Sequence, residues 1–350
     1  MKERFIHIFI PAALLLSLCG CGKENAAGSG SSSSSSELII TAAIDGTALR
    51  PGTRSAYSGT VFPYNRTLGL CVCVSEDGAP SLFEPHQLGY GNIRVTCTNN
   101  SGSAWSYYNS TLNLTLSSLY LTSREDGALV DIYAYTPYMD GVRDIRAIPV
   151  DFSKNQDYMW AEQNGVSNRS INPAEGTQIE VPLSFRHTLS RLRLGFKLEY
   201  SGSNHLLNYI TLRKTGGGTT AIYSSGKFNA LNGTYAQLEE AADSVRIGFG
   251  GTSGETNGLF SKADGYTYFD FLLYPTDYAA DDDLTLSFGI DGFRYEYAVK
   301  RSDVLHSDGT TYGFKGGFSY DFQFLLDNYV HLKGISIRSV WEHEEREDVL

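Results

Sequence analysis

The clearest prediction of the fold class comes from the segment Leu189-Ser190-Arg191-Leu192-Arg193-Leu194-Gly195-Phe196-Lys197-Leu198-Glu199-Tyr200. From Leu192 onward an apolar side chain stands at every second position, and polar residues or glycine stand between them. A period of two predicts a β-strand with one apolar face and one polar face. Arg191 and Arg193 are expected on the polar face of that strand.

Similar short strands are expected along most of the chain. Turn signals such as Asn232-Gly233 and Asp291-Gly292 separate the apolar runs. The composition, with 23 Tyr, 18 Phe and 36 Gly, suits pleated surfaces joined by turns. Few segments show a helical period, and the best helix candidate, residues 235–242, is short. The sequence therefore predicts an all-β fold built of β-sandwiches. The runs that predict strands, besides the opening stretch, are 38–44, 68–74, 111–116, 130–135, 177–185, 206–212, 244–248, 266–273, 284–290, 293–299, 318–325 and 334–341.

The N-terminus predicts export as a lipoprotein. Lys2 and Arg4 precede an apolar run, residues 5–18, that is too short and too interrupted for a membrane-spanning helix. The run ends in Leu18-Cys19-Gly20-Cys21, which looks like a lipobox. We expect residues 1–20 to be a signal peptide and Cys21 to carry the lipid. The serine- and glycine-rich residues 21–36 then form a flexible tether.

The remaining chain is long enough for two domains. The polar residues 166–176 contain Asn172-Pro173 and no apolar run, so the boundary is expected there. We assign residues 37–175 to an N-terminal β-sandwich domain and residues 176–350 to a C-terminal one.

Three cysteines fall within the expected folded part: Cys71, Cys73 and Cys97. Cys71 and Cys73 are two apart on a predicted strand and point to the same face. A disulfide between one of them and Cys97 and a set of three buried free thiols are both compatible with the sequence. No histidine lies near them at the spacing of metal ligands, so no metal site is expected.

Catalytic patterns are missing from the sequence. It contains no nucleophile elbow, no phosphate-binding loop and no His-Glu-x-x-His motif. His187 has no identifiable catalytic partner and is interpreted as a packed structural residue. The formal net charge of −11 argues against nucleic-acid binding, which needs a basic surface. We expect no enzyme activity and no cofactor.

An ordered set of motifs resembles the Bacteroidales fimbrillin-like (Mfa-like) lipoproteins, the type V pilus subunits. After the lipobox, the motifs are Thr53-Arg54, residues 131–138 (DIYAYTPY), residues 157–161 (DYMWA), residues 181–192 (VPLSFRHTLSRL) and residues 335–341 (ISIRSVW). The resemblance implies two transthyretin-like β-sandwich domains with Greek-key connections. It implies a surface lipoprotein of the outer membrane or fimbrium whose partners are other fimbrial subunits.

The resemblance also implies a mode of assembly. In stalk subunits of this family a surface protease cuts after an arginine beyond the first strand, and a neighbour's extended segment fills the place of that strand. The matching arginines are Arg54 and Arg50, with Arg54 favoured by the Thr-Arg pair. The exchanged strand would present Leu38, Ile40, Ala42 and Ile44. Retention of this strand, as in tip and anchor members, is the alternative.

The C-terminal tail departs from the stalk pattern. Residues 342–348 are strongly charged and lack the alternation of a donor strand. Either residues 335–341 are the donor segment or this subunit does not donate in that way, so stalk, tip and anchor roles stay open.

A different class of function is a monomeric glycan-binding lipoprotein of the outer membrane. Trp105-Ser106-Tyr107-Tyr108 motivates this alternative, because exposed aromatic rings stack on sugars. The competing interpretation of these four residues is an aromatic cluster in a strand or core. Contact with a host or bacterial surface glycan or protein is a further expectation for either function.

Overall fold

The computed structural model describes part of the chain. The described ranges are 35–44, 61–76, 79–85, 90–122, 129–166, 178–198, 205–215, 218–241, 244–248, 259–260, 265–278, 284–327 and 329–338. The predicted signal peptide, the lipidation site Cys21 and both candidate cleavage sites, Arg50 and Arg54, lie outside these ranges. So does the charged tail.

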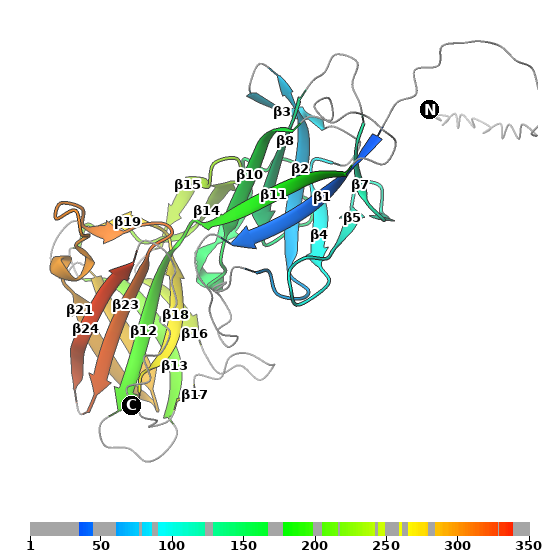
Figure 1. Ribbon diagram of the computed structural model, residues 1–350. Coiled ribbons are helices and arrows are strands. Elements are labelled where there is room, and N and C mark those ends of the chain that lie inside the picture. Colours follow the sequence, from blue (N-terminus) through cyan, green and yellow to red (C-terminus); the bar gives the residue numbers. More distant parts are fainter. Residues whose placement is uncertain are drawn as a thin grey trace, which may run out of the picture. The chain divides into compact units, whose positions relative to one another are not determined.

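The described residues form an all-β fold, as the sequence predicts (Figure 1). Their only helices are the short 3-10 turns η1 (Phe152–Lys154) and η2 (Arg301–Val304). The strands of the first half are β1 (Ser35–Ile44), β2 (Thr67–Glu76), β3 (Ala79–Pro85), β4 (Ile93–Cys97), β5 (Trp105–Asn109), β6 (Leu114–Leu116), β7 (Leu119–Thr122), β8 (Leu129–Thr136), β9 (Ile148–Asp151), β10 (Met159–Val166) and β11 (Gln178–His187).

The second half continues the same pattern of short strands with tight turns. Its strands are β12 (Ser190–Leu198), β13 (His205–Lys214), β14 (Tyr223–Asn229), β15 (Thr234–Glu240), β16 (Ser244–Gly248), β17 (Leu259–Phe260), β18 (Thr267–Leu273), β19 (Thr276–Asp277), β20 (Leu284–Ile290), β21 (Phe293–Val299), β22 (Gly313–Phe314), β23 (Ser319–Leu326) and β24 (Val330–Arg338).

The helix expected at residues 235–242 is wrong, because residues 235–240 belong to strand β15. Asn232-Gly233 turns the chain back, with Gly233 in the left-handed region at φ +71°. β15 then pairs with β14 in an antiparallel hairpin. A segment this short is a marginal helix in water, so the hydrogen bonds offered by an adjacent strand decide its structure.

The first half forms one ten-stranded sheet. Its order is β6-β5-β4-β2-β8-β10-β11-β1-β7, with β3 added beside β2. One apolar core contains buried residues from opposite ends of this order, such as Ile40 of β1 and Val95 of β4. The sheet therefore folds over and closes around its own core.

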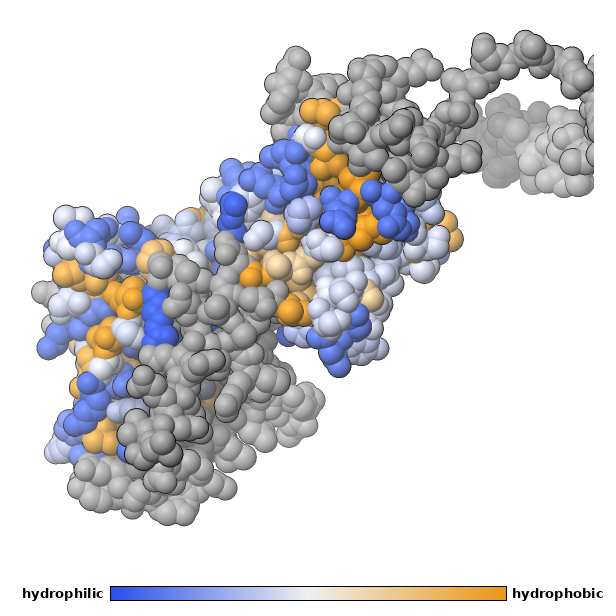
Figure 2. All heavy atoms as spheres, viewed as in Figure 1, coloured by the Kyte–Doolittle hydropathy of each residue, from blue (hydrophilic) through white to orange (hydrophobic). Residues whose placement is uncertain are grey.

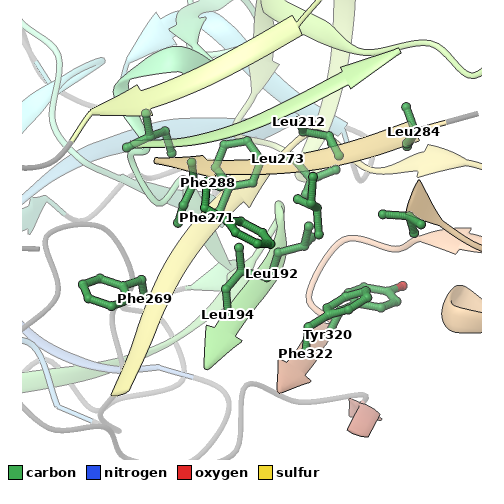
Figure 3. Packing of buried hydrophobic residues seen from close by; sticks show 14 of the residues in the cluster. Leu192, Leu194, Leu212, Phe269, Phe271, Leu273, Leu284, Phe288, Tyr320 and Phe322 are labelled. Atoms are coloured by element: carbon green, nitrogen blue, oxygen red, sulfur yellow. The ribbon is translucent and has the colours of Figure 1, made fainter. Parts of the chain in front are cut away.

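The second half contains a β-sandwich. One sheet has the order β18-β12-β23-β24 and the other β16-β13-β20-β21, with β17 beside β13. Leu192, Leu194 and Phe196 of β12 lie in the core between them (Figure 3). The rings of Phe196 and Phe288 meet edge to face with 5.0 Å between centroids. The predicted apolar face of the opening stretch is thus confirmed, whereas the transthyretin-like topology stays a prediction.

A three-stranded sheet, β15-β14-β9, joins residues from both halves of the chain. It covers the reverse face of the first sheet, where Cys71, Tyr133 and Tyr135 pack in a third core with Phe228 of β14. The division at residues 175 and 176 stays a prediction. Strands from both sides of it are nevertheless hydrogen-bonded, since β9 pairs with β14.

The three cysteines are buried free thiols. Cys71 and Cys73 belong to the third core, while Cys97 belongs to the core enclosed by the first sheet. Because the first sheet lies between these cores, a disulfide from Cys97 to either of the others is excluded. A hydrogen bond with Cys73, together with burial, raises the pKa of Cys71 well above its ordinary value.

We expect none of these three thiols to react with a water-soluble maleimide in the folded chain. All three should react after denaturation, because burial removes both access and thiolate character. Mass spectrometry of a chain that begins at residue 35 measures this without interference from Cys19 and Cys21. Rapid labelling of Cys71 in the folded state would contradict the burial described above.

Candidate functional site

The first strand is held along one whole edge and along part of the other. β1 pairs in parallel with β11 through eight residue pairs, from Glu37 with Gln178 to Ile44 with Phe185. On its other edge it pairs with β7 only at residues 35–38. Beyond these, the described residues add one bridge, between Ala43 and Val61. β1 therefore completes a groove whose main wall is β11.

The predicted exchangeable residues all point into the core. Leu38, Ile40 and Ile44 are buried, and Ala42 packs against the same core while partly exposed. The residues between them, such as Thr41, face outward. Burial of an aliphatic side chain contributes about 1.5–3 kcal/mol. Removing β1 would therefore uncover both an unpaired edge of β11 and an apolar surface.

Glu37 connects β1 to both flanking strands. Ser118, just before β7, donates a hydrogen bond to its carboxylate at 2.5 Å, and Gln178 of β11 donates another at 3.1 Å. The bond from Ser118, followed by that from Gln178, lowers the pKa of Glu37 below its ordinary value. The ionised form thus helps to hold the start of β1 in the groove.

This arrangement predicts an acid-sensitive start of β1. Because the folded pKa of Glu37 is lowered, its contribution is complete above the ordinary value of 4.5 and is lost as the pH falls through the lowered folded value. Glu37 is partly exposed, so screening by solvent keeps the loss below about 1 kcal/mol. Hydrogen exchange of the β1 amides at pH 7 and below pH 4.5 measures it. In a Glu37→Gln variant the protection factors, which correct for the intrinsic pH dependence of amide exchange, should be equal at both pH values. A wild-type difference preserved in this variant would contradict the assignment.

The last described strand is also an edge strand. Among the described residues, β24 pairs with β23 alone, at the margin of its sheet. Its inward side chains Val330, Leu332, Ile335 and Ile337 are only partly buried against the core. Apolar surface is visible over this region (Figure 2). β24 is therefore an amphipathic strand whose second edge has no partner among the described strands.

A buried polar cluster lies where the chain passes from β11 into β12. His187 contacts the carboxylate of Asp157 at 2.9 Å, and both side chains are almost fully buried. The side chain of Asn155 donates to the carbonyl of Asp270 at 3.0 Å and accepts from the amide of Leu272 at 2.7 Å. His187 is thus a packed structural residue, as interpreted from the sequence, and Asn155 fixes the loop after η1 to β18.

Arg191 also belongs to this cluster, and the sequence pattern predicts its exposure wrongly. We expected it on a polar outer face, yet it is fully buried. Its Nε donates to Ser319 Oγ at 3.1 Å, and Ser319 in turn donates to Asp321 at 2.7 Å. Burial lowers the pKa of Arg191, and the carboxylates of Asp270 and Asp321 act in the opposite direction. Arg191 is therefore a structural cation held inside the fold.

The four aromatic-rich residues at 105–108 do not form one exposed platform. Tyr107 is buried, and burial raises its pKa to about 12. Trp105 packs edge to face on Phe62 with 5.9 Å between ring centroids. Tyr108 lies under the guanidinium of Arg94 at 4.5 Å. The strand-cluster interpretation of this segment fits the structure better than the sugar-stacking one.

The described residues contain no group of three or more His, Cys, Asp or Glu side chains that could hold a metal ion. Within the described part of the chain, no helix has the length and apolarity needed to cross a bilayer.

Comparisons with solved structures agree with an all-β fold. A candidate cell adhesion protein from Bacteroides ovatus is similar over 87% of this chain and 97% of its own, with 15% identity and a TM-score of 0.56. Another from Bacteroides uniformis is similar over 80% of this chain and 93% of its own, with 15% identity and a TM-score of 0.51. The tip fimbrial protein Mfa3 from Porphyromonas gingivalis matches over 87% and 99%, with 9% identity and a TM-score of 0.40.

The match to a known protein family covers most of the chain. A model of the family described as fimbrillin-like matches residues 71–336. The chain belongs to the fimbrillin-like family and is a fimbrial subunit, part of a cell-surface appendage. A search of curated protein sequences finds no match.

Proposed function

We propose that this subunit joins its neighbours by exchange of the first strand. In this proposal the chain is exported as a lipoprotein, anchored to the outer membrane through Cys21, and cut after Arg54 or, as the second choice, Arg50. The cut would free β1 from its covalent link to Val61 and the rest of the sheet. An extended strand of a neighbouring subunit would then pair with β11 in its place.

The observation that carries the proposal is the way β1 is held. Its eight parallel pairs with β11 and three buried side chains are non-covalent contacts that another alternating strand can reproduce. A donor strand satisfies the free backbone groups of β11 and places every second side chain in the apolar groove. The subunit would thus act through its strand edges, and the proposal assigns no catalytic activity to this chain.

The donor segment we propose includes the end of β24. Ile335 and Ile337 alternate as Leu38 and Ile40 do, and their strand is bonded to β23 on one edge only. An edge strand with partly buried apolar residues loses fewer contacts on release than a central strand does. The continuation of this segment, residues 339–341, lies outside the described residues.

The proposal can be tested in filaments purified from cells. Ser184 of β11 and Ser336 of β24 are both outward-facing, so a Ser184→Cys/Ser336→Cys chain places a thiol on each proposed partner strand. In filaments of this double variant, we expect a short bismaleimide to link neighbouring chains. The matched control combines Ser184→Cys with Thr310→Cys, another exposed position, and its chains should be linked only weakly. Equal linkage of both pairs would contradict exchange at β11. Absence of the protein from filaments by immunogold labelling, with no assembly defect on its deletion, would defeat the fimbrial role altogether.

A further inference from the structure

A groove of about 330 Å³ opens in the loop between β8 and β9. Met139, Val142 and Pro149 give it apolar walls, and Asp140, Arg143 and Asp144 line it as well. Its volume lies at the lower end of the range of about 300–1,000 Å³ typical of small-molecule sites. None of the features used for strand exchange involves this loop.

The loop is held in place from beneath. The side-chain amide of Asn92 donates to the carbonyls of Met139 and Val142 at 3.1 and 3.3 Å. The hydroxyl of Tyr135 donates to Asn92 at 3.0 Å and accepts from the amide of Met139 at 3.3 Å. A binding site whose walls are fixed before the ligand arrives avoids the entropic cost of ordering them. The groove is therefore preformed.

The far end of the loop is fixed as well. Ile145 is buried in the third core, and its carbonyl accepts from the amide of Ala230 at 2.8 Å. The ring of Tyr135 lies against Gly69, where an added Cβ would stand 2.1 Å from a ring carbon. This contact leaves Tyr135 no room to move toward β2, so the support under the groove is rigid.

Of the charged side chains that line the groove, the two carboxylates have hydrogen-bond partners and the guanidinium has none among the described residues. Asp144 is neutralised by Arg146, whose guanidinium binds it with bonds of 2.8 and 2.9 Å. Asp140 accepts from the hydroxyl of Tyr138 at 3.0 Å. Arg143 is exposed, and no described residue forms a hydrogen bond or ion pair with it. One guanidinium fork in the groove thus remains available to a ligand.

We propose that this groove binds a saccharide unit that carries a carboxylate. A guanidinium recognises a carboxylate through two parallel hydrogen bonds. The apolar walls suit the C–H face of a sugar ring, and the carboxylate of Asp140 accepts hydroxyl donors. A peptide would need an open strand edge or a longer trough, and this groove is bounded by one short loop. The inference does not require strand exchange, because the groove exists with β1 in place.

The test is calorimetric titration of the full-length, uncleaved chain with defined probes. Methyl glucuronide and the methyl glycoside of N-acetylneuraminic acid are the acidic sugars, methyl glucoside is the neutral sugar, and N-acetylglutamate is a carboxylate without a sugar ring. We expect at least one acidic sugar to bind at least tenfold more tightly than the glucoside and the N-acetylglutamate. Arg143→Ala should lower that affinity at least tenfold, and Arg143→Lys should restore part of it.

Lys333→Ala is the matched control, because it removes an exposed positive charge from β24 and leaves the groove unchanged. Its affinity should equal that of the unaltered chain. Absence of binding by both acidic sugars overturns the proposal. Equal binding of the glucoside or of N-acetylglutamate, or an affinity unaffected by Arg143→Ala, overturns it as well.

Discussion

We expect Ile40→Asp to release β1 from the first sheet while the C-terminal sandwich stays folded. The substitution removes about 1.5–3 kcal/mol of apolar burial and would place an unpaired charge in the core. Ile40 is 2% exposed, so the carboxylate reaches water only if the strand leaves the groove. The docking of β1 should therefore weaken by more than about 3 kcal/mol.

Hydrogen exchange measures this release strand by strand. Amides of β1 and the facing edge of β11 should lose protection, whereas amides of β12 and β23 should keep theirs. Thr41→Asp is the control, because it adds the same charge to the adjacent, outward-facing residue. Its exchange should resemble that of the unaltered chain. Uniform loss of protection across the first sheet and the C-terminal sandwich would show that β1 is an inseparable part of the fold.

Arg191→Leu should lower the free energy of unfolding by about 3–5 kcal/mol, because it removes a buried cation from beside Asp270 and Asp321, although Asp321 keeps its ion pair with Arg193 at 3.6 Å. Asp270 and Asp321 are 5% and 6% exposed, and both act electrostatically on Arg191. Urea unfolding followed by tyrosine and tryptophan fluorescence measures the change. Lys197→Leu, on the same strand but partly exposed, should change stability by no more than about 0.5 kcal/mol.

A double variant, Arg191→Leu with Asp270→Asn, distinguishes the effect of the lost charge on stability from the effect of the changed side-chain shape. Removing the carboxylate as well should recover part of the stability lost in Arg191→Leu, because fewer unpaired charges remain buried. If the two residues do not interact, their effects on the free energy of unfolding simply add. The double variant would then be less stable than Arg191→Leu by as much as Asp270→Asn alone destabilises the unaltered chain, and the charge explanation would be wrong.

The sequence predicts the structural features that depend on the local alternation of apolar and polar residues. The apolar face of β12 and the inward set Leu38, Ile40, Ala42 and Ile44 follow from a period of two, since each strand buries one face. The hairpin at Asp291-Gly292 follows from turn chemistry. These features depend on residues close together in the sequence, and the structure has them where the pattern places them.

What the sequence does not predict depends on distant segments. Arg191 is buried among residues from distant segments, such as Ser319 of β23 and Asp270 of β18, which no spacing within residues 189–200 indicates. β15 is a strand because β14 lies beside it. The groove around Arg143 exists because Asn92 and Tyr135, from separate strands, hold one loop. Of the candidate site residues, Cys21, Arg50 and Arg54 stay predictions.

We propose above that β1 is replaced when the subunit assembles. Identification of the N-terminal residue of the protein in purified fimbriae shows whether this replacement happens. N-terminal sequencing of the filament-bound chain should give Ser55, with no peptide from residues 35–44 recovered by mass spectrometry. An acylated Cys21 at the start of the filament-bound chain, with residues 35–44 retained, would contradict the claim.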